Sequence, residues 1–167
     1  DVHFWHGAKV LRLGLPPKPW DWHHDGDVEQ FCRQWFKREN FDEIEAHSMQ
    51  ILTAAPLRVA KELGIPYRVV LHDGWWISRL QFLTKDDGTP VDPADPTSDL
   101  EPEMEAELRQ ALVERRKDLT EVLDAAEERL AVSESFADLY RFAGIRGVGV
   151  RRNQVSAPAS QAVDRVF

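Results

Sequence analysis

The residues best suited to chemistry stand at the end of an apolar run, in the segment 70–76. The apolar, β-branched run 67–71 predicts a buried strand, and Gly74 permits a sharp turn soon after it. His72 and Asp73 would then lie at the end of the strand, where an imidazole and a carboxylate can exchange hydrogen bonds or protons with a ligand. Adjacent strand residues point to opposite faces, so a structural histidine bound to a loop carbonyl is the alternative for His72.

Two tryptophans follow at once, and aromatic rings beside hydrogen-bonding groups suit the apolar face of a sugar. Trp75 and Trp76 belong to a set of six tryptophans in a chain of 167 residues. Each of the six must either fill the core or line a pocket, and the core is the ordinary place for side chains of this size. The sequence leaves both alternatives open for this pair.

Two further polar residues are expected beyond strand ends. Ser133 joins a short strand to a helix, so free backbone N–H groups there could meet an anion or a sugar hydroxyl. Capping of the helix explains the same serine equally well. Asn153 follows the last expected strand. In a parallel sheet wrapped by helices, ligands bind beyond the carboxyl ends of the strands, where His72, Ser133 and Asn153 would all lie.

The densest group of possible metal ligands is His23, His24, Asp25 and Asp27. Zinc sites draw their ligands from separated segments, and adjacent side chains of one short loop rarely surround an ion. We therefore expect a solvated loop before a helix, with no metal site and no cofactor. A metal-dependent hydrolase that uses this cluster is the weakest of the functional alternatives.

Alternating strands and helices are expected to position these residues. Helical spacing of apolar residues behind Asp27, with Gln30 three residues later, predicts a helix capped by Asp27. The region 44–71 predicts a βαβ unit with parallel strands and a right-handed crossover. The whole pattern predicts an α/β fold, a Rossmann-like parallel sheet flanked by helices, in a single domain of residues 1–167. The expected strands are 9–13, 44–47, 67–71, 130–132 and 148–151, and the expected helices begin near residues 27, 52, 102 and 133.

One segment departs from this alternation. Residues 85–102 contain four prolines and many aspartates but little apolar material. Such a composition cannot bury enough surface to fold on its own, so we expect a mobile acidic loop at the surface.

Composition limits the class of protein. The formal net charge of −8 and the pI near 5.2 argue against nucleic-acid binding, which needs a basic surface. Cys32 is the only cysteine, so an internal disulfide is excluded and a reducing, cytoplasmic setting is expected. The sequence contains no run of about 18 apolar residues and no leader pattern, which predicts neither a membrane span nor a signal peptide. Peripheral contact with a membrane stays open.

Three segments follow one another along the chain: FDEIEAHS (41–48), AKELGIP (60–66) and VLHDGWW (70–76). In this order they resemble the D-x-V-H-x-H, A-x-x-x-G-I-P and T-x-H-D-x-W-W patterns of the amino-terminal domain of family-4 glycosyltransferases. The later segment from Asp124 to Ser135, the Gly144-Ile145 pair and the segment RNQV (152–155) also resemble the family. The likeness covers residues 41–155, and its segments in order are more specific than any one alone.

The resemblance implies a retaining glycosyltransferase of the two-domain GT-B architecture, with this chain as its acceptor-side half. The enzyme would transfer a sugar from a nucleotide-sugar donor, bound through a second domain, to a sugar, glycolipid or polysaccharide acceptor. His72 would be the catalytic residue that reaches the donor sugar. The implied substrate-binding residues are Asp73, Trp75, Trp76, Arg79, His47, Ser133 and Asn153.

Three departures from the family pattern limit this expectation. The opening glycine-rich loop is not visible, and no two glutamates stand eight apart, so the E-x₇-E donor motif is absent. Gln154 stands where the family has glycine after the asparagine. We therefore expect the donor-binding domain to be missing and the isolated chain to lack transfer activity. The rival hypothesis is a non-catalytic carbohydrate- or protein-binding module of the same fold.

Overall fold

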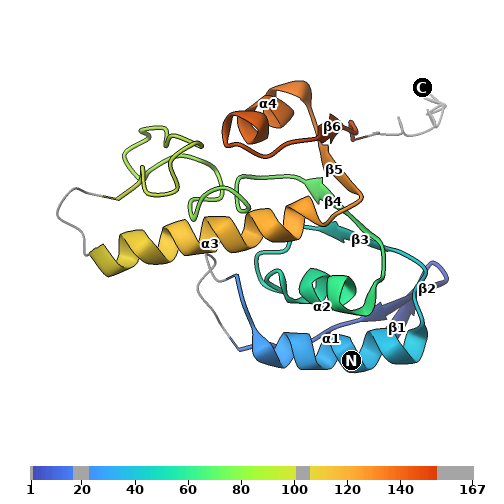
Figure 1. Cartoon of the computed structure of the whole chain (residues 1–167). Helices are drawn as coiled ribbons and strands as arrows, with labels where there is room; N and C mark the ends of the chain where they lie inside the picture. The colour runs from blue at the N-terminus through green and yellow to red at the C-terminus, as the bar shows by residue number, and fades with distance from the viewer. Residues whose placement is uncertain (1, 17–22, 101–105, 154–167) are drawn as a thin grey trace, which may run out of the picture.

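The computed structural model describes residues 2–16, 23–100 and 106–153 (Figure 1). Its centre is a four-stranded parallel sheet with the strand order β3-β4-β5-β6. This arrangement confirms the predicted α/β class and is compatible with a Rossmann-like fold. The strands are β3 (Ile44–His47), β4 (Tyr67–Leu71), β5 (Glu128–Ala131) and β6 (Val148–Val150).

In the described part of the chain, four helices flank the sheet. In Figure 1, α1 and α2 lie together on one side of the view, α3 runs across the middle, and α4 lies near β6 at the opposite end. The core between these elements is apolar and includes the fully buried residues Leu57, Val59, Leu71, Leu119, Leu123 and Tyr140. The helices are α1 (Gly26–Glu39), α2 (Ala55–Leu63), α3 (Ala106–Asp124) and α4 (Glu134–Phe142). Within the described part of the chain, no helix combines the length and the apolar character that a membrane span needs.

A hairpin absent from the prediction precedes the sheet. The expected strand 9–13 is β2 (Ala8–Leu11), which pairs antiparallel with β1 (Val2–Trp5). His6 and Gly7 form the turn, and both have positive φ, at 46° and 83°. Two positive φ values in succession are typical of the tight turns that join antiparallel strands. The side chain of Trp5 is 67% exposed, so this hairpin contributes little to the core.

The first helix begins at a different aspartate from the one predicted. Asp25, not Asp27, is the N-cap of α1, and its Oδ1 accepts hydrogen bonds from the backbone N–H groups of Asp27 at 2.9 Å and Val28 at 3.1 Å. Asp25 is 4% exposed, so these bonds are shielded from water. Because the cap satisfies otherwise free N–H groups, Asp25 fixes where the helix starts.

We expect Asp25→Ala to lower the free energy of unfolding by about 1 kcal/mol, because two backbone N–H groups at the start of the helix lose their acceptor. Urea denaturation followed by circular dichroism measures the change. Asp27→Ala is the matched control, since Asp27 lies in the first turn but is not the cap. Equal losses in the two variants would contradict the assigned cap.

The acidic segment contains more internal structure than its composition suggests. In residues 85–100, Asp87, Asp92 and Asp95 each accept a hydrogen bond from the backbone N–H two residues later, at 2.8 Å. Val91 and Leu100 are buried. The aspartates therefore build consecutive turns. The mobility expected for this segment stays a prediction, and its last residues, 101 and 102, lie outside the described residues.

Candidate functional site

Two histidines meet at the carboxyl edge of the parallel sheet. His47 is the last residue of β3, and His72 directly follows β4. The parallel register pairs His47 with Val70, which places the two histidines at the same edge. The distance between His47 Nδ1 and His72 Nε2 is 2.8 Å, a hydrogen bond between the rings. The structure thus brings together two residues that the sequence assigned to one site.

The cluster continues through two charged residues that the sequence reasoning missed. His47 Nε2 lies 2.7 Å from Glu45 Oε1, and Arg151 donates to Glu45 Oε2 at 2.6 Å. Side chains two residues apart on a strand share a face, so Glu45 and His47 stand together while Ala46 is buried on the other side. The Glu-x-His spacing was therefore a usable signal, whereas Arg151 is 106 residues away in the sequence.

The neighbouring charges and hydrogen bonds determine the protonation states of Glu45 and His72. The hydrogen bonds from Arg151 and His47 lower the pKa of Glu45 to about 2. Partial burial lowers the pKa of His72, the nearby His47 and Arg151 lower it further, and Asp73 opposes them. At neutral pH the site therefore presents an ionised Glu45 and an uncharged His72.

Asp73 holds the turn after β4. Its Oδ1 accepts from the backbone N–H of Trp75 at 3.0 Å, while its Oδ2 accepts from Gln81 Nε2 at 3.0 Å and from Gln50 Nε2. Its backbone carbonyl accepts from the Tyr140 hydroxyl at 2.5 Å. Both carboxylate oxygens are thus engaged within the protein, so Asp73 positions the segment that carries His72.

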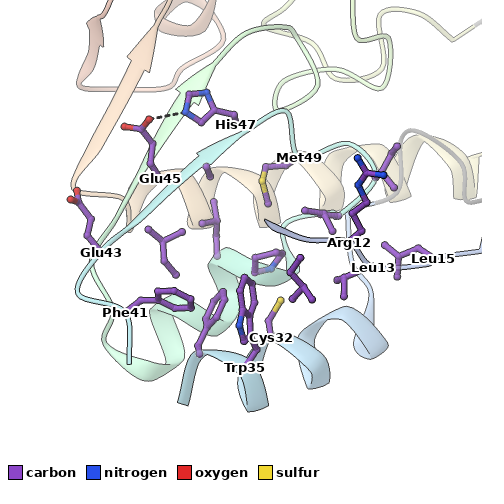
Figure 2. A pocket seen from close by; sticks show the side chains of 18 residues that line it. Arg12, Leu13, Leu15, Cys32, Trp35, Phe41, Glu43, Glu45, His47 and Met49 are labelled. Carbon is purple, nitrogen blue, oxygen red and sulfur yellow. Dashed lines mark hydrogen bonds and ion pairs between the residues drawn. The ribbon is translucent and has the colours of Figure 1, made fainter. Parts of the chain in front are cut away.

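Two cavities adjoin the histidines. The smaller, of about 280 Å³, has His72 and Asp73 on one side, and its remaining lining is mainly apolar: Gln81, Phe82, Leu83, Pro90, Val91, Pro93, Phe136 and Leu139. The larger, of about 660 Å³, lies between α1, β3 and the segments 11–15 and 49–57. Figure 2 shows Glu45 and His47 near one end of this larger cavity; Glu43 and Arg12 also line it, among side chains that are mostly apolar.

Trp75 and Trp76 lie in the core and line neither of the two cavities. Trp75 is 0% exposed and Trp76 is 3% exposed, and their ring centroids lie 5.1 Å apart in the core. Neither lines the cavity beside His72, where Phe82 and Phe136 supply the aromatic surface instead. The expected aromatic wall of Trp75 and Trp76 is therefore not present in this structure.

No protein-family model, curated protein or solved structure matches the chain. The likeness to family-4 glycosyltransferases therefore rests on the sequence segments described above.

The remaining candidate substrate residues lie apart from the histidine pair or have structural partners. The guanidinium of Arg79 forms an ion pair with Asp99, whose side chain is 2% exposed, and so anchors the acidic segment. Ser133 is the N-cap of α4, and its Oγ accepts from the backbone N–H of Phe136 at 3.2 Å. Asn153 is exposed beyond β6. Capping, the second explanation for Ser133, accounts for its position fully.

The suspected metal ligands are divided among separate interactions. His23 pairs with Asp118 at 3.4 Å, His24 pairs with Glu29 at 3.0 Å, and Asp25 caps α1. Across residues 2–16, 23–100 and 106–153, no group of three or more His, Cys, Asp or Glu side chains is arranged to hold a metal ion. The cluster thus has a structural explanation for each of these three residues.

Proposed function

We propose that this chain is the acceptor-binding half of a retaining glycosyltransferase that works in the cytoplasm on a sugar, glycolipid or polysaccharide. The observation that carries the proposal is an uncharged imidazole, His72, which lines a cavity at the carboxyl edge of the parallel sheet. Ligands of open α/β folds bind at this edge. The family-like segments in the sequence supply the reaction class.

The chemistry of the smaller cavity suits a sugar. Phe82 and Phe136 give it apolar surface for the face of a pyranose ring, and His72 gives it a hydrogen-bonding nitrogen. Its volume of about 280 Å³ is at the small end for ligand pockets. A cavity of this size favours one sugar unit over a whole nucleotide sugar, as an acceptor side requires.

The larger cavity favours the second candidate, a carbohydrate- or protein-binding module without chemistry. Its lining is mostly apolar, and Ile51 at its edge is 73% exposed. Apolar surface of this kind marks contacts with a partner more often than sugar binding. The two functions therefore predict ligand contacts at different places on the chain.

NMR titration of the ¹⁵N-labelled chain with monosaccharides, disaccharides and UDP-glucose distinguishes the two candidate functions. We expect saturable shifts at His72, Phe82 and Phe136 with at least one saccharide, and no tighter binding of UDP-glucose. Phe82→Ala should weaken saccharide binding by about 3- to 10-fold, because it removes stacking surface. Phe142→Ala, which changes a phenylalanine that is 66% exposed and does not line this cavity, is the matched control.

The outcomes that contradict the proposal are equally specific. Absence of any shift with the saccharides would remove the acceptor-binding function. Shifts confined to the larger cavity, around Cys32, Met49 and Leu57, would favour the binding module instead.

A further inference from the structure

We propose that Glu45, His47 and His72 form a proton relay that leaves Nδ1 of His72 free to accept a proton from a hydroxyl group of a bound ligand. The identity of that hydroxyl as a sugar hydroxyl rests on the proposed function. The relay itself rests only on the positions of the three side chains, and it assigns Glu45 and His47 as positioning residues for His72.

The direction of each hydrogen bond follows from the ionised carboxylate. A carboxylate can only accept, so Nε2 of His47, 2.7 Å from Glu45 Oε1, must carry the proton. A neutral imidazole carries one N–H, which leaves Nδ1 of His47 as an acceptor. The 2.8 Å contact then requires His72 to donate from its Nε2. Because His72 is also neutral, its Nδ1 carries no proton.

The free nitrogen of His72 is available to a ligand. The hydrogen bond that the structure shows for the His72 ring, among the residues it describes, uses Nε2. His72 also lines the smaller cavity, whereas His47 lines the larger one. A bare imidazole nitrogen accepts hydrogen bonds, so His72 selects a hydroxyl or another donor and disfavours a carbonyl or phosphate oxygen at that point.

The proton transfer balances within these groups. The ligand's O–H bond breaks, its proton forms a new bond to His72 Nδ1, and the bonding electron pair stays on the oxygen. The proton on His72 Nε2 passes to His47 Nδ1 along the 2.8 Å hydrogen bond. His72 is again neutral, with its N–H now at Nδ1, and the positive charge rests on His47 beside the carboxylate of Glu45.

The surrounding charges favour that final location. Glu45 contacts His47 directly, and Arg151 holds the other carboxylate oxygen in place at 2.6 Å. Arg68 lies farther off, 3.9 Å from Glu45 Oε2, and Asp73 is adjacent to His72. The same logic orients a catalytic histidine through a carboxylate in hydrolase triads, with a second histidine inserted here.

The test uses the chain with ¹⁵N-labelled histidine and no ligand, so its failure is separable from failure of the transferase proposal. When both rings are neutral, we expect both as Nε2–H tautomers and a through-hydrogen-bond coupling between His47 Nδ1 and His72 Nε2. Glu45→Gln keeps an acceptor oxygen but gains an amide that can donate, so His47 should lose its fixed Nε2–H tautomer and the coupling to His72 should weaken or disappear. Glu43→Gln is the matched control, because Glu43 binds Arg68 and neither histidine.

Three results would overturn the relay. The first is an Nδ1–H tautomer of neutral His47, the second is absence of the coupling in the wild-type chain, and the third is an equal effect of Glu45→Gln and Glu43→Gln on that coupling. Glu43 and Glu45 are both exposed, so the two variants should fold. The coupling in the wild-type chain tests the relay without any variant.

Discussion

Trp75→Ala is expected to lower the free energy of unfolding by about 3 to 5 kcal/mol, the largest loss of stability predicted for this chain. Trp75 is 0% exposed, so truncation removes buried apolar area and leaves a cavity. Arg115 lies over the indole at 5.1 Å and donates to the Trp75 carbonyl at 2.6 Å, and Arg115 itself is 4% exposed. Loss of the ring therefore also removes a contact of a buried cation.

Urea denaturation measures this change, with Trp5→Ala as the matched control. Trp5 is 67% exposed, so its truncation should cost less than about 1 kcal/mol. Trp75→Phe keeps part of the ring and should remain folded if Trp75→Ala does not. Similar, small losses at both tryptophans, together with reduced saccharide binding by Trp75→Ala, would show that Trp75 faces a ligand.

Trp75 was expected in a pocket or in the core, and the structure places it in the core. The sequence predicts the strands but not the direction of the turn that decides this. Strands β3 and β4 span the predicted residues because apolar runs and their glycine or proline boundaries are local signals. The direction in which the chain turns after β4 is not local. It depends on Tyr140 and Arg115, which bind the turn from α4 and α3 and are 67 and 40 residues away from their partners in sequence.

The N-cap of α1 also depends on contacts that are distant in the sequence. Asp27 with Gln30 matched a capping pattern, but Asp25 has the cap because the chain before α1 is held elsewhere. The carbonyl of His23 accepts from the backbone N–H of Ala54 at 3.3 Å, and His23 precedes the N-cap Asp25 by two residues. Competition between two nearby caps is decided by such long-range contacts.

The sequence could predict part of the candidate site, but not the approach of Arg151. His47 and His72 could be placed together because both end neighbouring parallel strands, and Glu45 shares a strand face with His47. Arg151 could not be placed, since its approach depends on the strand order β3-β4-β5-β6 and on the path of the chain after β6. Strand order is a property of the whole sheet and leaves no local pattern in the sequence.

His72 is proposed to act in the reaction, so its removal should lower the turnover rate more than the stability of the fold. If His72 contacts the reacting groups as charge develops, losing it costs about 2 to 4 kcal/mol in the barrier, or roughly 30- to 1000-fold in turnover. The thermal midpoint should hardly change, because His72 is only partly buried and bonds to the exposed His47. His24→Ala is the matched control, since His24 is exposed and pairs with Glu29 of α1.

The most direct test compares turnover and thermal midpoint of wild type and His72→Ala in the chain joined to the donor-binding domain that the proposed function requires. We predict a fall in turnover of roughly 30- to 1000-fold with an unchanged midpoint. A lowered midpoint with near-normal turnover of the folded fraction would contradict this account, because His72 would then be a structural residue at the end of β4.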